Sequence, residues 1–253
     1  MNLLEISHLT VKYAETEVIK DVSFTVEEGQ WLMIVGPNGA GKTTILNAIS
    51  GLLPYDGEIL FRGSNIHSLK PAELARHVGI LSQHHLVGYD FTVREVVNLG
   101  RYAYERRLFG RSTEGNDDSV QEAIRIAGLE GMEHKSVLHL SGGEIQRAFL
   151  AQLFAQNPDI MILDEPANHL DLVYQKQVFE LIGKWLNEPG RAVISVVHDL
   201  SLAKAYGTHC LLLNEGVQTA LGPVSDVLTP DQLDPVYQMD VYAWMRKMLG
   251  QWT

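Results

Sequence analysis

The stretch "QWLMIVGPNGAGKTTILNAISGL", residues 30–52, decides the fold. It opens with an apolar run, continues through a loop with three glycines, and passes through Lys-Thr-Thr into a helical pattern. A continuous apolar run bounded by such a loop is typical of a strand buried on both faces of a parallel sheet. Residues 36–43 fit the pattern G-x-x-x-x-G-K-[ST], in which a strand, a phosphate-binding loop and a helix follow one another. The sequence therefore predicts an α/β protein with a P-loop NTPase core, a RecA-like parallel sheet.

The loop residues have the chemistry that a triphosphate needs. Gly36, Gly39 and Gly41 let backbone amides turn toward phosphate oxygens, and the helix N-terminus adds a partial positive charge. Lys42 is expected to reach the β- and γ-phosphates, and the Thr43 hydroxyl to take one Mg²⁺ position. A glycine turn that only capped a helix would not need the Lys-Thr pair. The predicted nucleotide-binding residues are Gly36, Pro37, Asn38, Gly39, Ala40, Gly41, Lys42, Thr43 and Thr44.

A second apolar run, "IMILDEP" at residues 160–166, ends in two carboxylates. Open α/β sheets bind ligands at the carboxyl ends of their strands. We expect Asp164 to hold the Mg²⁺ shell and Glu165 to polarise the attacking water. The alternative is a strand that surfaces at a turn, but two adjacent carboxylates at the end of a buried strand are costly without a cation or hydrogen bonds.

Three further residues each have two interpretations. His198 follows the apolar run "AVISVV" and could contact the γ-phosphate and the water, or could be a solvated residue at a strand end. Gln83, in "GILSQHH", could reach Mg²⁺ or water, or could be an ordinary polar residue that enters a loop. Tyr13 could stack on an adenine ring, or could pack within its strand as aromatic residues usually do.

The remaining sequence suggests one domain with an insertion. Residues 3–35 alternate apolar and polar side chains as half-buried antiparallel strands do, and residues 72–156 are mostly of helical pattern. Within the second range we expect a helix over residues 93–104 and a polar, glycine-containing surface loop over residues 107–119. From residue 159 the chain returns to alternating strands and helices. We predict a core with an N-terminal antiparallel β subdomain, about residues 1–83 and 157–253, and an inserted α-helical subdomain at about 84–156.

Composition excludes several classes of protein. The chain has 31 acidic and 20 basic residues, a net charge of −11, which argues against a dedicated nucleic-acid binder. With the single cysteine Cys210, neither an internal disulfide nor a cysteine metal cluster can form. No apolar run is long enough to cross a bilayer, and we expect no secretory signal at the N-terminus.

A second glycine pair lies in "HLSGGEIQRAFLAQ", residues 139–152, at the start of a helical pattern. With the phosphate loop, "LSGGE" and "LDEP" in that order, the whole chain resembles an ATP-binding cassette (ABC) ATPase. The resemblance implies that ATP is the nucleotide, that Tyr13 stacks on its adenine, and that Gln83 senses Mg²⁺. It also implies that His198 meets the γ-phosphate and that Glu165 is the general base. Asp171, in "NHLD", would face an opposing subunit.

The same resemblance gives the second glycine loop a purpose. Ser141, Gly142 and Gly143 are expected to close over the ATP held by a second copy of the chain, so that each loop is half of a site. Several segments, among them "FTVREVVNLGRYAY" and "GPVSDVLTPDQLDPVYQMDV", are similar to cassettes of importers for iron–siderophore complexes, haem and cobalamin. Ile145, in place of a basic residue, and Ala167, in place of a Thr, depart from the usual pattern.

Those importers imply the partners and the location. Two cassettes would pair with integral membrane permease subunits on the cytoplasmic face of the cell membrane, and a substrate-binding protein would deliver the cargo. A soluble cassette of iron–sulfur cluster assembly and an importer of another metal, manganese or zinc, stay open as alternatives. DNA-repair cassettes place a long coiled coil between the two glycine loops, whereas Thr44 and Ser141 are only 97 positions apart.

Overall fold

The computed structural model describes residues 1–82, 90–104 and 116–252. Its N-terminal part is an antiparallel sheet in the order β2-β1-β4-β5, formed by β1 (Asn2–Tyr13), β2 (Thr16–Glu27), β4 (Asp56–Phe61) and β5 (Ser64–Asn65). Along β1 and β2 the side chains on one face of the sheet are buried, among them Leu4, Ile6 and Val22, and those on the other face are mostly exposed. This alternation is what the sequence pattern predicted.

A six-stranded sheet carries the functional residues. Its order is β10-β9-β3-β8-β7-β6, from β10 (Val217–Pro223) and β9 (His209–Asn214) through β3 (Trp31–Val35), β8 (Ala192–Val196) and β7 (Ile160–Asp164) to β6 (Val78–Leu81). The strands from β9 to β6 are parallel, and β10 pairs antiparallel with β9. Every residue of β3, β7 and β8 is buried, as expected for central strands.

The core lies on both faces of this sheet. Along β3, Trp31, Met33 and Val35 point into one apolar cluster, whereas Leu32 and Ile34 point into the other. The first cluster continues into the helices between β6 and β7, and the second fills the space against the N-terminal sheet. The predicted fold class, an α/β P-loop core with an antiparallel β subdomain and a helical insertion, is confirmed.

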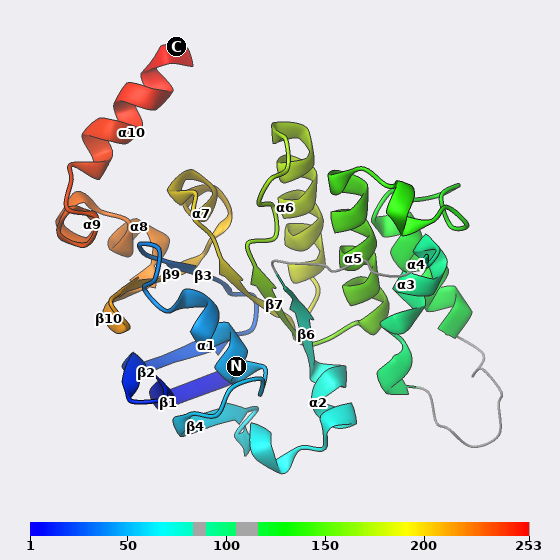
Figure 1. Cartoon of the computed structure of the whole chain (residues 1–253), viewed down its shortest axis with the longest axis horizontal. Coiled ribbons are helices and arrows are strands. Elements are labelled where there is room, and N and C mark those ends of the chain that lie inside the picture. The colour runs from blue at the N-terminus through cyan, green and yellow to red at the C-terminus, as the bar shows by residue number, and fades with distance from the viewer. Residues whose placement is uncertain (83–89, 105–115, 253) are drawn as a thin grey trace.

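The helices fall into three groups (Figure 1). Helices α1 (Lys42–Ile49), α2 (Pro71–His77), α6 (Leu172–Leu186) and α7 (Leu200–Tyr206) belong to the core. Helices α3 (Val93–Leu99), α4 (Asn116–Ile126) and α5 (Gly142–Gln156) lie together at the β6 end of the sheet. At the opposite end, α8 (Val224–Val227) and α9 (Pro230–Tyr237) lead to α10 (Val241–Leu249), which projects from the body.

Some boundaries differ from the sequence prediction. The helix expected over residues 93–104 ends at Leu99, and Tyr102–Tyr104 form a separate 3-10 turn. At the C-cap, Gly100 packs so close to α5 that a Cβ there would lie 2.1 Å from the Gln152 carbonyl oxygen. The loop expected over residues 107–119 is wrong for its last four residues, which begin α4, with Asp117 and Asp118 in the first turn. Strand β10 was not predicted at all. No helix of the described residues is both long enough and apolar enough to cross a membrane.

Candidate nucleotide site

The phosphate loop joins β3 to α1, and tight packing requires its glycines. A Cβ on Gly36 would lie 2.1 Å from the Leu213 carbonyl oxygen, so β9 approaches the loop too closely for any side chain. Gly41 has φ +97° and is the N-cap of α1, a conformation that favours glycine. The loop is therefore shaped before any ligand arrives, with the N-terminus of α1 at its end.

Lys42 is the buried cation of the site, 6% exposed. Its Nζ donates to the carbonyl oxygens of Gly36 and Pro37, at 2.8 Å each, so the side chain curls back over its own loop. Burial lowers the pKa of Lys42, while the carboxylates of Glu165 and Asp164 oppose that shift. The side chain is thus held at the place where phosphate oxygens are expected, and it has two weakly basic partners that an anion can displace.

Thr43 and Asp164 come together from two different elements. The Thr43 hydroxyl donates to Asp164 Oδ1 at 3.3 Å, which joins the first turn of α1 to the end of β7. Asp164 is 8% exposed, and burial raises its pKa. Among the described residues no group of three or more His, Cys, Asp or Glu could hold a metal. One carboxylate and one hydroxyl fit Mg²⁺, which usually takes one or two carboxylates and completes its shell with substrate phosphates and water.

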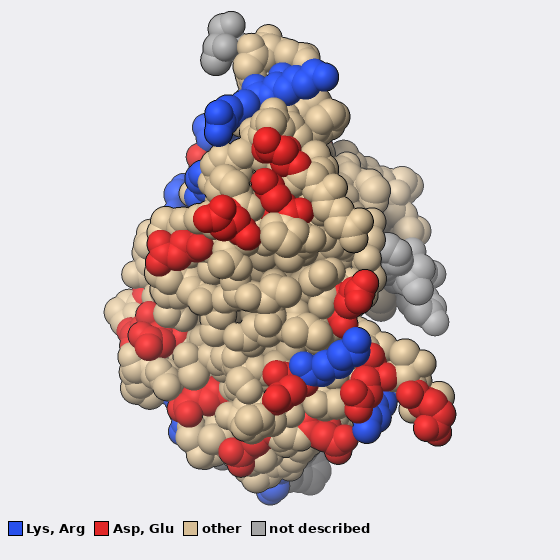
Figure 2. Space-filling view, turned by 90° about the vertical axis from the view of Figure 1, so that its left-hand side faces the viewer, with Lys and Arg blue, Asp and Glu red and all other residues tan. Residues whose placement is uncertain are grey.

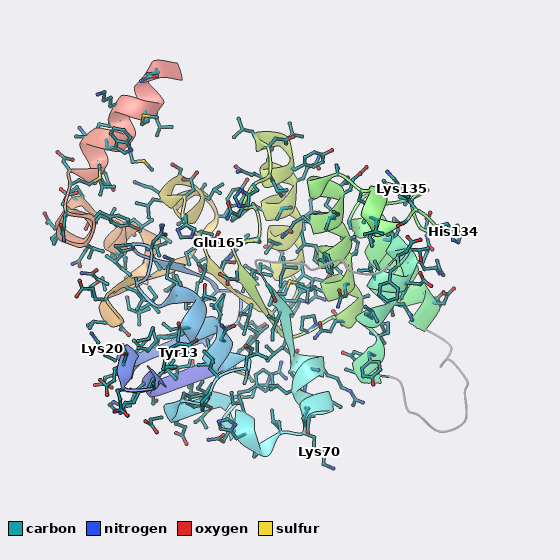
Figure 3. All side chains as sticks on the ribbon, in the orientation of Figure 1. Tyr13, Lys20, Lys70, His134, Lys135 and Glu165 are labelled. Carbon is teal, nitrogen blue, oxygen red and sulfur yellow. The ribbon has the colours of Figure 1, made fainter. Side chains whose placement is uncertain are left out.

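Glu165 lies just past β7 with φ +52°, in the left-handed region. Its carboxylate is 9% exposed, and Oε1 lies 2.5 Å from His198 Nε2. Oε2 accepts a hydrogen bond from the Asn168 side-chain amide. Asp164, Glu165 and His198 therefore lie at the carboxyl ends of the neighbouring strands β7 and β8, as the sequence indicated, and Figure 3 shows Glu165 at this edge of the sheet.

These residues surround one pocket of about 380 Å³. Its lining includes Val18, Asn38, Gly39, Gly41, Lys42, Thr43, Thr44, Glu165 and His198. Tyr13 does not line this pocket: it ends β1, opposite Thr16, and is 47% exposed on the N-terminal sheet (Figure 3). Adenine stacking by Tyr13 stays a prediction. Gln83 lies outside the described residues.

The second glycine loop is the start of α5. Ser141 is the N-cap: its Oγ accepts from the Glu144 N–H, and the Glu144 carboxylate accepts from the Ser141 N–H. A Cβ on Gly142 would meet no atom within 4 Å, whereas one on Gly143 would lie 2.5 Å from the ring of Tyr174. None of these three residues lines the pocket at the phosphate loop. The two loops do not form one site within the chain.

The structure accounts for one of the two departures from the family pattern, Ile145. Ile145 is partly buried and packs against the larger apolar cluster, where a basic side chain would lose solvation. Ala167 is 5% exposed, in the loop after Glu165. Sequence reasoning missed Val18, Asn168 and Gln146, whose Nε2 donates to the Pro166 carbonyl at 2.6 Å. The only signal for Asn168 and Gln146 is their position two residues after the "LDEP" and "LSGGE" segments.

Comparison with known proteins identifies the family. The model of the ABC transporter family matches residues 19–168, more than half of the chain. The chain thus belongs to the ABC transporter family. It is the ATP-binding, ATP-hydrolysing member of such a system.

Individual relatives sharpen this result. YvrA of Bacillus subtilis (strain 168), an uncharacterized ABC transporter ATP-binding protein, is 40% identical over 91% of this chain and 52% of its own length. The chain thus spans about half of YvrA. YclP from the same organism, a petrobactin import ATP-binding protein, is 32% identical over 94% of both chains. The dimeric post-hydrolysis structure of the ATP-binding cassette MJ0796, bound to ADP and Pi, matches with a TM-score of 0.75 at 27% identity, over 87% of this chain and 98% of that one.

Proposed function

We propose that the chain is the ATP-hydrolysing subunit of a membrane importer for an iron chelate, a siderophore or haem, or for cobalamin. Two copies would pair with permease subunits on the cytoplasmic face of the membrane, and a substrate-binding protein would deliver the cargo. Support comes from the resemblance of the chain to importer cassettes and from the petrobactin import protein that it matches along nearly its full length. A cassette of iron–sulfur cluster assembly, or of manganese or zinc import, is the alternative.

One observation carries the proposal: the phosphate loop, Glu165 and His198 line a single pocket. Thr43, part of that lining, donates a hydrogen bond to the Asp164 carboxylate. In this pocket, Lys42 exchanges its loop carbonyls for β- and γ-phosphate oxygens of ATP, and the loop amides hold the phosphates. Mg²⁺, held by Thr43 and Asp164, would neutralise charge on the phosphate oxygens. Glu165 accepts the proton of the attacking water, and His198 turns from Glu165 toward the γ-phosphate.

The start of α5 has the chemistry to cover a bound nucleotide. Ser141, Gly142 and Gly143 begin a helix whose N-terminal amides and partial positive charge suit a phosphate. Because they do not line the pocket of their own chain, we infer that they cover the pocket of a second copy. Two copies would then enclose two ATP molecules, and release of phosphate would let the pair open.

The acidic surface fits a partner other than nucleic acid. Figure 2 shows one face of the molecule, on which carboxylates are spread widely and lysine and arginine gather in a few small groups. Together with the net charge of −11, such a face would repel a phosphate backbone.

The test is Glu165→Gln, with Ser141→Arg as its complement. Glu165→Gln should bind MgATP, stop turnover and accumulate an ATP-bound dimer, visible by size-exclusion chromatography with light scattering. Ser141→Arg should keep ATP binding on its own phosphate loop and lose both dimer and turnover. Wild-type turnover in Glu165→Gln, or a monomer with ATP, would contradict the mechanism. Recovery of integral membrane subunits with the tagged chain from native membranes tests the importer; recovery of soluble scaffold proteins alone would reject it.

A further inference from the structure

The Glu165 carboxylate is held from two sides by residues of its own chain. Oε1 contacts His198 Nε2, at the end of β8, and Oε2 accepts from the Asn168 amide, three residues further along the chain. A carboxylate turns easily about its last side-chain torsion, because that torsion has broad minima. Two donors on its two oxygens remove that freedom. The family motifs explain His198, but they give no role to Asn168.

Asn168 is well placed for such a role because its loop is anchored at several points. The Glu165 N–H donates to the Val196 carbonyl, and the Asn168 N–H donates to the Glu165 carbonyl, both at 3.1 Å. Gln146, on α5, donates to the Pro166 carbonyl at 2.6 Å, which fixes the backbone between the two residues. At the far end of the loop, Asp171 caps α6 through the Tyr174 N–H at 3.0 Å. The anchored backbone of this loop thus directs the side-chain amide of Asn168 toward Glu165 Oε2.

We propose that Asn168 is a positioning residue for Glu165, and this inference rests on the proposed function of that carboxylate. When ATP binds and His198 turns toward the γ-phosphate, Oε1 becomes available to the attacking water. Asn168 still holds Oε2, so the free oxygen keeps its direction. A general base has to lie within hydrogen-bond reach of the proton that it accepts, and an unrestrained carboxylate would spend much of its time turned away.

The placement of Asn168 predicts which kinetic constant depends on it. Asn168 does not line the pocket at the phosphate loop. It lines a smaller pocket of about 110 Å³ behind Glu165, with Gln175 and Phe179. It therefore has no expected contact with ATP. Loss of its amide should lower kcat and leave the binding of ATP unchanged.

Two substitutions in the full chain test this. Asn168→Ala removes the side-chain donor, and Asn168→Asp keeps the shape but replaces the donor by an acceptor of like charge. Each should lower kcat by about tenfold or more, since a hydrogen bond to a charged group is lost, and should leave KM and the Kd of a fluorescent ATP analogue with Mg²⁺ within about twofold. Asn187→Ala, at the exposed C-cap of α6, is the matched control and should behave as wild type.

Each other outcome overturns the proposal. Unchanged kcat in either variant means that the amide does not orient the base. A parallel rise in the Kd for ATP, or a fall in melting temperature that the control lacks, means that Asn168 only maintains the structure. The loop is predicted to face the second copy, so a double variant that combines Asn168→Ala with Glu165→Gln is also needed. Loss of the ATP-bound dimer in this double variant would mean that Asn168 acts in the dimer contact instead. If wild type neither binds nor hydrolyses ATP, the proposed function itself fails.

Discussion

Lys42 offers the sharpest test of how the phosphate loop works, because the structure gives its two hydrogen-bond partners, the carbonyl oxygens of Gly36 and Pro37. Lys42→Met keeps a side chain of similar length and removes the cation. The Gly36 and Pro37 carbonyls then lose their donor, which costs about 1–2 kcal/mol. Against this, burial already lowers the pKa of Lys42, so removing the buried charge recovers part of that cost. The melting temperature of the free chain should therefore change by only a few degrees, at about 2–4 °C per kcal/mol for a chain of this size.

The effect on ATP should be larger. A charged hydrogen-bond donor contributes about 1.5–3 kcal/mol, but Lys42 must leave two carbonyls to contact the phosphates, so we expect the lower end, about tenfold in Kd. A tenfold weaker Kd removes about 1.4 kcal/mol of ligand stabilisation at saturating ATP, or roughly 3–6 °C of the ATP-induced shift. Turnover should fall further, because charge develops on those oxygens in the transition state.

Differential scanning fluorimetry with and without MgATP measures both quantities in one experiment, and fluorescence titration gives the Kd independently. Lys70→Met, at an exposed site at the start of α2 (Figure 3), is the matched control. An unaltered ATP-induced shift in Lys42→Met would refute the reasoning. So would a large loss of stability in the free chain, which would mean that Lys42 is mainly a structural anchor of the loop.

Three more predictions follow from single contacts. Asp164→Asn removes a buried carboxylate whose pKa is raised by its burial. Without ATP the variant should therefore melt a few degrees higher than wild type, while Mg²⁺-dependent hydrolysis is lost. A lower melting temperature would contradict this prediction. Gly143→Ala should destabilise the chain by about 1–3 kcal/mol, because its Cβ meets the Tyr174 ring. Gly142→Ala should leave the melting temperature unchanged and reduce turnover only. Equal melting temperatures for the two variants would contradict the packing. Burial raises the pKa of Cys210 to about 12, so the folded state keeps the thiol neutral. The resulting contribution to the free energy of unfolding is full below the unfolded pKa of about 9 and is lost as pH rises toward 12. A thiol reagent at pH 8 should therefore label Cys210 only in urea.

How far the sequence predicts the structure depends on whether a feature is local. The central strands β3, β7 and β8 were predictable because five consecutive buried residues leave a continuous apolar run. Strand β10 was not, since its residues alternate between exposed and half-buried and it pairs with β9 at the edge of the sheet. Helix α1 ends at Ile49, earlier than its apolar pattern suggests, because Gly51 takes φ +71° and turns the chain.

The candidate site divides in the same way. Lys42, Thr43, Asp164 and Glu165 follow from motifs in which neighbours along the chain are neighbours in space. Lys42, Thr43 and Glu165 line one pocket, and Asp164 accepts a hydrogen bond from Thr43. Gln146 reaches the Glu165 loop from α5 through a hydrogen bond to the Pro166 carbonyl, a contact between elements that no local pattern records. Asn168 lies in the loop itself, three residues after Glu165, but its contact depends on a loop conformation in which Glu165 takes φ +52°. Because Gln146 lies on the same helix as Ser141, the loop of Glu165 is tied to the element proposed to cover the partner's ATP. A shift of α5 on closing would therefore reach Glu165, the proposed general base of its own chain, through Pro166, so that the two half-sites of one chain need not act independently.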